Sequence, residues 1–338
     1  MPSAFARSLL LLVLLSIGLR AGASETGLQS AVVFTDDFPL ASRAELVRRT
    51  LSPLNAVRAQ QQAPAGQAID LAHEKFTLYV PADAPPHGYA LMVYVSPWPG
   101  SAVPDRWAPV LDQHGMIFVS AANAGNDANV LDRRAPLALL AAHNVMARYP
   151  VDPQQVFVGG FSGGSRVALR LALAYPDLFQ GALLDAGSDP IGEALPPPPI
   201  DLFRRFQERA RLVYLTGERD DFHIAEDRRS RTSMQDWCIF AIDAVTMPWT
   251  AHDQADPASL NGALDVLVQP ARLDAQRLAD CRAHLDAELA ARFQQVENLM
   301  ASHKADEAWP LLSRLDAQYG GLAAMRTIEL VRKLGAGR

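Results

Sequence analysis

A single pentapeptide limits what this chain can fold into more than its bulk composition does. Gly160-Phe161-Ser162-Gly163-Gly164 fits the pattern G-x-S-x-G, which occurs often enough by chance to be weak on its own. Its context is more specific, because an apolar run typical of a buried strand precedes it and a helical pattern follows it. This strand–turn–helix arrangement predicts a tight turn that presents Ser162 as a nucleophile.

A turn of this kind holds its serine in a strained backbone conformation with the hydroxyl exposed. Side chains two residues before and after the serine would collide, so space is expected to require Gly160 and Gly164. The backbone N–H of Gly163 is expected to face the place where an oxyanion forms. Neither G-x-G-x-x-G nor a Walker lysine is present, which argues against a phosphate loop. A turn of this shape without chemistry and an ordinary loop stay open as alternatives.

Short apolar segments alternate with helical patterns through the middle of the chain. This order predicts βαβ units and a mostly parallel sheet with helices on both faces. The predicted strands are Lys75–Ala82, Tyr89–Ser96, Gly115–Ala121, Gln155–Gly160, Gly181–Gly187, Arg211–Gly217 and Ala244–Trp249. Helical patterns cover Ser42–Gln62, Arg134–Tyr149 and Ser165–Ala174. The four prolines within Leu195–Ile200 predict a stiff polyproline link on the surface.

A nucleophilic serine needs a base, and an acid that orients the base. In the fold suggested here the order along the chain is serine, acid, histidine, with the last two in loops after later strands. His252 follows the last predicted strand and is the expected base; a solvated loop histidine beside Asp253 is the alternative. The other histidines precede Ser162 (His73, His87, His114, His143), lie in the acid loop (His223) or lie in the C-terminal helices (His284, His303).

The acid is expected in the loop YLTGERDDFH, which follows the strand Arg211–Gly217. Asp220 and Asp221 both lie in this loop, and only one of them can point toward the imidazole. We favour Asp220 and keep Asp221 as the alternative. Asp185, at the end of the preceding strand, is a more distant candidate and is also expected as a buried carboxylate that organises a loop.

A second oxyanion donor is expected from the loop VSPWPGS, which follows the strand Tyr89–Ser96. Pro97 and Pro99 have no N–H, so only Trp98 or Gly100 can donate from the backbone. We favour Trp98, whose indole could also form a wall of the acyl or leaving-group site. The alternative is that the Trp98 side chain only covers the edge of the sheet.

Together these residues make the chain similar to the α/β-hydrolase superfamily, and within it to secreted serine esterases grouped with polyhydroxybutyrate depolymerases and feruloyl or acetylxylan esterases. The similarity runs from about Lys75 to Leu267 and is carried by KFTLYVPADAPPHGYALMVYVSPWPG, by YPVDPQQVFVGGFSGGSRVALRLALAYPDLFQGALLDAG, by LTGERDDF and by MPWTAHD. The resemblance implies an α/β-hydrolase fold with Ser162 as nucleophile, Asp220 as acid and His252 as base. The chain departs at Ser96-Pro97, where these esterases usually have a His-Gly-type sequence.

The N-terminus has the pattern of a secretory signal peptide. Arg7 precedes the apolar run Ser8–Leu19, and the small residues Ala21–Ala23 predict cleavage before Ser24. An uncleaved N-terminal anchor is the alternative, and no membrane span is expected after cleavage. The protein is therefore expected to be exported, either periplasmic or secreted.

The chain has two cysteines, Cys238 and Cys281, both within predicted helical segments. In an oxidising compartment such a pair predicts either a disulfide between helices or two buried thiols, and the sequence leaves both open. Their spacing does not suggest a metal site, and we expect neither a metal nor a cofactor. A net charge of −6 without a basic cluster argues against nucleic-acid binding.

Three helical patterns follow residue 270, at Arg272–Ser302, Ala305–Gln318 and Leu322–Leu334. We therefore divide the chain into a signal peptide (1–23), a helical or irregular segment (24–74), a hydrolase domain (75–270) and a helical C-terminal extension (271–338). The extension is expected to pack on the hydrolase domain, or to mediate contact with a partner protein or a second copy.

The predicted function is hydrolysis of a carboxylic ester, either a small molecule or a polymer, through a Ser-His-Asp triad and an acyl-enzyme. One alternative is a weakly active or inactive binding or scaffold protein on the same fold. Another is a serine peptidase, although no motif that would anchor a peptide's backbone or terminus is apparent.

Overall fold

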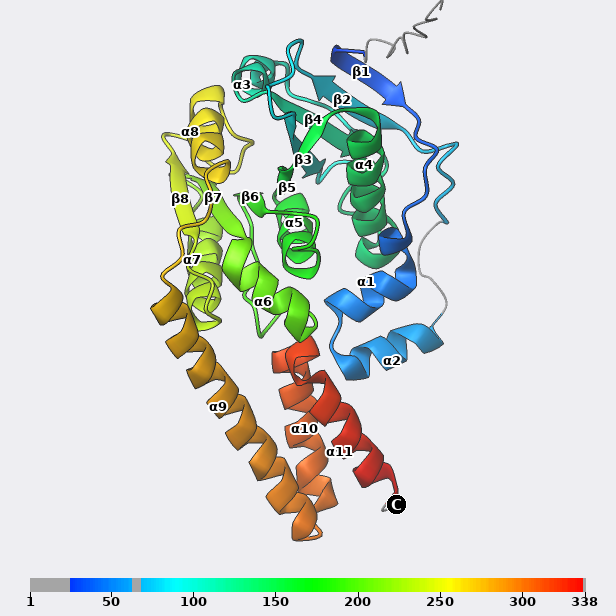
Figure 1. Cartoon of the computed structure of the whole chain (residues 1–338), viewed down its shortest axis with the longest axis vertical. Helices are drawn as coiled ribbons and strands as arrows, with labels where there is room; N and C mark the ends of the chain where they lie inside the picture. The colour runs from blue at the N-terminus through cyan, green and yellow to red at the C-terminus, as the bar shows by residue number, and fades with distance from the viewer. Residues whose placement is uncertain (1–24, 63–67, 337–338) are drawn as a thin grey trace, which may run out of the picture.

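Eight strands form one central sheet in the computed structural model, which describes residues 25–62 and 68–336 (Figure 1). Their order is β1-β2-β4-β3-β5-β6-β7-β8. β2 is antiparallel to β1 and β4, and all pairs from β4 to β8 are parallel. The strands are β1 Gly27–Val32, β2 Phe76–Val80, β3 Tyr89–Val95, β4 Met116–Ala121, β5 Val151–Phe161, β6 Gly181–Asp185, β7 Arg211–Gly217 and β8 Ile242–Met247.

Helices cover both faces of this sheet, so β3, β4 and β6 are buried along their whole length. One apolar core joins the sheet to α1, α4, α5, α6 and α7, and a second core joins the other face to α3 and α8. The bounds are α1 Arg43–Thr50, α3 Ala108–Gln113, α4 Ala135–Arg148, α5 Gly163–Ala174, α6 Ile200–Arg209, α7 Asp221–Asp236 and α8 Pro257–Leu267. The predicted mostly parallel sheet with helices on both faces is confirmed.

The N-terminal part differs from its prediction in two places. An additional edge strand, β1, pairs with β2 in a segment expected to be helical or irregular. The single helix predicted over Ser42–Gln62 is two helices, α1 and α2 (Pro53–Gln61). Pro53 is the physical reason, because proline disfavours the helical conformation in the residue before it and suits the first turn of a new helix. Ser52 is accordingly extended, with ψ of 155°.

The proline-rich link is another correction. Leu195 is 1% exposed, and Pro197 and Pro198 are also buried, so this segment is not on the surface. It lies beneath the short 3-10 turn Gly320–Ala323, where the Gly321 N–H donates to the Pro197 carbonyl oxygen at 2.7 Å. The C-terminal helices therefore cover the polyproline segment.

The C-terminal extension consists of α9 (Ala275–Ala301), α10 (Ala305–Tyr319) and α11 (Ala324–Ala336), which project from one end of the body in Figure 1. The Tyr319 ring packs on Trp237 at 5.2 Å between centroids, and Arg282 donates to the Gln207 side chain at 2.6 Å. A disulfide joins Cys281 in α9 to Cys238, just past the end of α7. The extension is thus packed on the body and bonded to it covalently.

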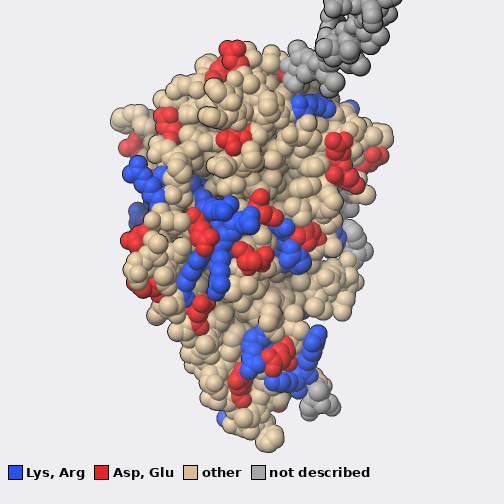
Figure 2. All heavy atoms as spheres, viewed as in Figure 1, with Lys and Arg blue, Asp and Glu red and all other residues tan. Residues whose placement is uncertain are grey.

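In Figure 2, charged side chains of both signs gather in a band across the middle of the face and in a smaller group near its lower end. Several arginines are paired with carboxylates, among them Arg166 with Asp189 and Glu226, and Arg229 with Glu193. Within residues 25–62 and 68–336, no helix combines the length and apolar character needed to cross a bilayer. The predicted signal peptide lies outside the described residues.

Candidate active site

Ser162 occupies the turn between β5 and α5, at the carboxyl end of the parallel strands. Its φ of 54° and ψ of −122° are unusual for a residue with a side chain, and such strain is typical of functional turns. The Ser162 N–H donates to the Asp185 carbonyl oxygen on the neighbouring strand at 2.8 Å. The backbone of the turn is therefore fixed from β6.

The two flanking glycines leave no room for a side chain. A Cβ added at Gly164 would lie 1.9 Å from the Val95 carbonyl oxygen. One added at Gly160 would lie 2.5 Å from the carbonyl carbon of Gly164. The close packing predicted for this turn is present, with β3 forming one of its walls.

The structure brings Ser162, His252 and Asp220 into one hydrogen-bonded row. His252 Nε2 lies 3.0 Å from Ser162 Oγ, and His252 Nδ1 lies 2.7 Å from Asp220 Oδ2. Because a carboxylate only accepts, Nδ1 carries the imidazole proton and Nε2 is free to accept from the serine hydroxyl. Burial opposes ionisation of Asp220, but hydrogen bonds from His223 and His252 outweigh it and hold the pKa below its ordinary value.

The other two acidic candidates lie elsewhere. Asp221 is the first residue of α7 and is exposed, whereas Asp220 is the N-cap of that helix and is buried. Asp185 is also buried, and its Oδ2 accepts from the Ala255 N–H at 3.1 Å in the loop after His252. Burial raises the pKa of the Asp185 carboxyl well above its ordinary value, and the Ala255 bond only partly opposes this.

A second imidazole, which the sequence did not indicate, binds the same carboxylate. His223 Nδ1 lies 2.9 Å from Asp220 Oδ1 and 2.8 Å from Oδ2. The rings of His223 and His252 are stacked 4.2 Å apart with 9° between their planes. The only sequence signal was the spacing Asp-x-x-His at the start of a helix, which brings the two side chains onto one turn.

These rings belong to a longer row of aromatic contacts. Trp98 stacks on Phe161 at 5.6 Å, and Phe161 stacks on His252 at 4.7 Å. At the other end Phe222 meets His223 edge-on at 5.0 Å. Trp98 is 49% exposed and Phe222 is 65% exposed, so large apolar surfaces face solvent on both sides of His252.

The predicted oxyanion loop has a different arrangement from the expected one. The Trp98 N–H donates to Ser96 Oγ at 3.1 Å, so a side chain already accepts this hydrogen bond. The Asn126 amide lies close to the Gly163 backbone, since a Cβ added at Gly163 would lie 2.2 Å from its Oδ1 and 2.9 Å from its Nδ2. A half-turn of this amide about its last bond would bring the NH₂ group to the position of Oδ1. Sequence reasoning gave no signal for Asn126.

Asp220, His223 and His252 are also the group of potential metal ligands found within the described residues, with ligand atoms within 4.8 Å of one another. However, His223 Nδ1 and His252 Nδ1 lie 2.8 Å and 2.7 Å from the same carboxylate oxygen, Asp220 Oδ2, so the ring atoms nearest the carboxylate already bond to it. Both nitrogens also face the carboxylate. The arrangement fits two N–H bonds to Asp220 better than a metal ion.

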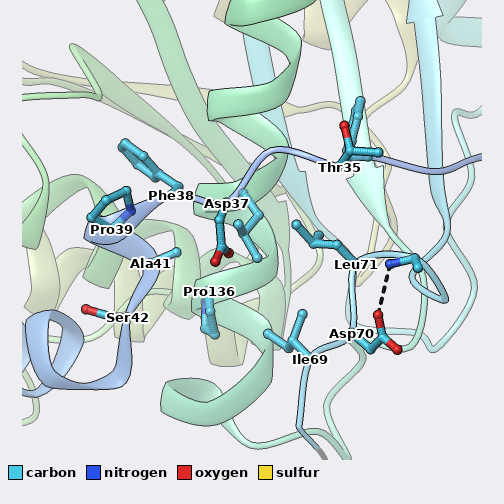
Figure 3. A pocket seen from close by; sticks show the side chains of 13 residues that line it. Thr35, Asp37, Phe38, Pro39, Ala41, Ser42, Ile69, Asp70, Leu71 and Pro136 are labelled. Carbon is cyan, nitrogen blue, oxygen red and sulfur yellow. Dashed lines mark hydrogen bonds between the residues drawn. The ribbon is translucent and has the colours of Figure 1, made fainter.

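A separate cavity of about 710 Å³ lies between the segment before α1, residues 69–72 and the start of α4. Figure 3 shows its mostly apolar wall, with Asp37 and Asp70 as its carboxylates. Asp70 accepts from the Ala72 N–H at 3.1 Å. Neither Ser162 nor His252 lines this cavity, so it is distinct from the candidate active site.

The strand order, the serine turn after β5, the acid after β7 and the histidine after β8 together define the α/β-hydrolase fold. No family model matches the chain. A poly(3-hydroxybutyrate) depolymerase from Ralstonia pickettii is 29% identical over 99 residues, which cover 25% of this chain and 20% of the depolymerase. The matched segment is thus only a fifth of that relative's length.

Two solved structures of hydrolases also resemble part of the chain. S-formylglutathione hydrolase from Staphylococcus aureus is 12% identical, with a TM-score of 0.46, over 59% of this chain and 94% of its own. Acetyl xylan esterase from Aspergillus awamori is 12% identical, with a TM-score of 0.42, over 53% of this chain and 89% of its own. At such identities a likeness concerns chain architecture and not substrate.

Proposed function

We propose that this protein is an exported serine hydrolase that cleaves carboxylic esters. The observation that carries the proposal is the pair of hydrogen bonds from Asp220 to His252 and from His252 to Ser162, at 2.7 Å and 3.0 Å. The strained backbone of Ser162 supports it, because the turn exposes the hydroxyl at the carboxyl edge of the sheet.

In the proposed reaction, Ser162 Oγ attacks the ester carbonyl carbon while its proton passes to His252 Nε2. Asp220 keeps the other imidazole nitrogen protonated and stabilises the imidazolium that forms. The Gly163 N–H and the Asn126 side-chain amide are our proposed donors to the oxyanion. One such donor lowers the activation barrier by about 3 kcal/mol. The Trp98 N–H, the donor favoured on sequence, competes for this role only if it leaves Ser96.

Collapse of the tetrahedral intermediate breaks the ester C–O bond. The departing alcohol takes the proton from His252 Nε2 and leaves an acyl group on Ser162. Water then enters, gives its proton to His252 and releases the carboxylic acid by the reverse sequence. The exposed Trp98 and Phe222 rings offer apolar surface to the groups on either side of the ester. We therefore expect esters that carry rings or longer alkyl groups to be cleaved best.

Export is part of the proposal. It is supported by the signal-like N-terminus and by the disulfide between Cys238 and Cys281, because disulfides persist mainly in oxidising compartments. Cell fractionation of the full-length chain tests it, with processed protein expected outside the cytoplasm.

Purified protein on a panel of p-nitrophenyl esters, together with a fluorophosphonate probe, tests the chemistry. We expect turnover and covalent labelling in the wild type, and a fall in kcat of at least about 10⁴-fold with loss of label in Ser162→Ala. A wild-type protein that neither turns over esters nor accepts the probe would contradict the proposal. That result would favour the binding or scaffold alternative.

A further inference from the structure

The carboxylate of Asp220 serves two imidazoles rather than one. His252 Nδ1 contacts Oδ2 at 2.7 Å, and His223 Nδ1 contacts both oxygens at 2.8 and 2.9 Å. The His223 side chain is 14% exposed, compared with 38% for His252. The second imidazole is therefore the more deeply buried of the two.

The start of α7 explains how His223 reaches this position. Asp220 is the N-cap of α7, and its side chain accepts from the His223 backbone N–H at 3.4 Å. His223 is the third helical residue, where a side chain can reach back to the cap, as glutamate does in a capping box. Here the side chain returns to the cap carboxylate itself. Helix α7 thus holds Asp220 through both the backbone and the imidazole of one residue.

The charges around His223 come from several elements. On α7, Glu226 Oε2 lies 4.0 Å from His223 Nε2, and the buried Asp227 lies one residue further along. From α5, Arg166 pairs with Glu226 and also with Asp189 of the loop after β6. The backbone of Gly187 faces the edge of the His223 ring, and the His252 ring covers one of its faces.

Two consequences for the base follow from this geometry. A carboxylate that accepts a second N–H bond has less negative charge available for His252, so it stabilises the imidazolium less. Any positive charge on His223 would also lie directly against the face of the His252 ring and oppose its protonation. Both effects act in the same direction and favour the unprotonated base.

We propose that His223 is a positioning residue of the hydrolytic site. It orients Asp220, and it keeps His252 less basic than His252 would be if it were the only imidazole bonded to Asp220. The inference rests on the proposed function, since it concerns the same serine, histidine and aspartate. It implies that the enzyme keeps a working base to lower pH than it would without His223.

Three variants separate the parts of this role. His223→Phe keeps a stacking ring and removes the donor, His223→Asn places an amide NH₂ near the former Nδ1, and His223→Ala removes both. In His223→Phe the acid limb of kcat/KM is expected to move to higher pH by about 0.5 to 1 unit. Activity would then fall about 3- to 10-fold at pH 6 and less than about twofold at pH 8.5, with KM nearly constant. His223→Asn is expected to restore the wild-type limb.

A purely structural role would instead lower activity equally at all pH values and reduce Tm. An unchanged limb in His223→Phe overturns the proposal. A limb that moves equally in His223→Asn and His223→Phe overturns the donor role in the same way. Thermal melts of each variant establish that the folded states are being compared.

Imidazole ¹⁵N NMR on the wild type and on His223→Phe provides a readout that does not depend on turnover. We expect His223 to carry its proton on Nδ1, and the His252 titration to move to higher pH in the variant. A wild-type His223 with a bare Nδ1 contradicts the inference even if esters are cleaved. Conversely, absent turnover with coupled histidine titrations contradicts only the proposed function.

Discussion

The two sides of Ser162 are built in different ways. On the base side, side chains at the ends of β7 and β8 bond to one another in series from His252 to Asp220 to His223. On the oxyanion side, the loop after β3 is held by the backbone of the loop after β4, with the Asn126 N–H donating to the Pro97 carbonyl oxygen at 2.9 Å. The base side therefore depends on residue identity at strand ends, and the oxyanion side depends on loop conformation.

This difference shows which half of the site a sequence can specify. Chain order and strand ends predict a candidate base and a candidate acid, because these side chains lie at the same edge of a parallel sheet. A backbone donor depends on where one N–H points, and two prolines in this loop restrict the choice without deciding it. The Trp98 N–H is an example, because its hydrogen bond to Ser96 Oγ depends on the conformation of the loop and not on a sequence pattern.

The largest expected effect comes from breaking the base side. Asp220→Asn is expected to lower kcat by about 10³- to 10⁴-fold, because an amide cannot hold the productive imidazole tautomer in the same way. Asp221→Asn is the matched control, and we expect nearly wild-type kcat because Asp221 is exposed. Steady-state hydrolysis of p-nitrophenyl acetate measures both, and equal losses in the two variants would contradict the assignment of the acid.

An intermediate effect is expected on the oxyanion side. Asn126→Ala should lower kcat by about 10- to 100-fold with little change in KM, since a donor to the oxyanion acts mainly in the transition state. Ser96→Ala, which frees the Trp98 N–H, is the comparison variant and is expected to stay within about threefold of the wild type. If Asn126→Ala leaves kcat unchanged while Ser96→Ala raises kcat, the Trp98 N–H is the donor instead.

The smallest effect concerns Asp185, which joins the serine turn to the histidine loop. Its carbonyl oxygen accepts from Ser162, and its carboxyl accepts from Ala255 in the histidine loop. Because folding raises the pKa of this carboxyl, the folded state binds its proton more tightly, and ionisation costs stability as pH rises above the unfolded pKa. Asp185→Asn should therefore gain stability relative to the wild type at pH 8 and show little gain near pH 4.

Urea unfolding at the two pH values measures this difference, with Asp221→Asn as the exposed control. Activity is expected to remain within several-fold of the wild type, because the asparagine amide oxygen can still accept from Ala255. A variant that becomes less stable as pH rises, relative to the wild type, would contradict the sign of this prediction.

Sequence patterns predicted the parallel core of the fold well, because β3 to β8 and their helices follow apolar periodicity and punctuation by glycine and proline. They missed β1, a short strand that alternates between exposed and partly buried residues at the sheet edge and has little apolar signal. The sequence patterns predicted α1 and α2 as one helix, because residues typical of helices continue on both sides of Pro53. The burial of Pro197 depends on the extension that covers it, which no local pattern specifies.

The site followed the same rule. The strand order of the fold places Ser162, His252 and Asp220 together, whereas the choice between Asp220 and Asp221 depends on which residue caps α7. The place of His223 in the acid loop argues against it as the base. The proposed role of His223 through Asp220 becomes visible only in the structure, where the rings of His223 and His252 stack beside the carboxylate. Asn126 comes from a loop with no motif, so only its proximity to Gly163 in the structure suggests it as a candidate.

The packing of the C-terminal helices has a consequence for how the molecule comes apart. Side chains of α9 to α11, including Phe293 and Tyr319, belong to the same continuous apolar cluster as the strands and helices around Ser162. A domain that shares one core unfolds as one cooperative unit, so heating is expected to melt the body and the extension in a single transition. Proteolysis or recombination within α9 would therefore remove part of the protein's shared apolar core instead of releasing a detachable module.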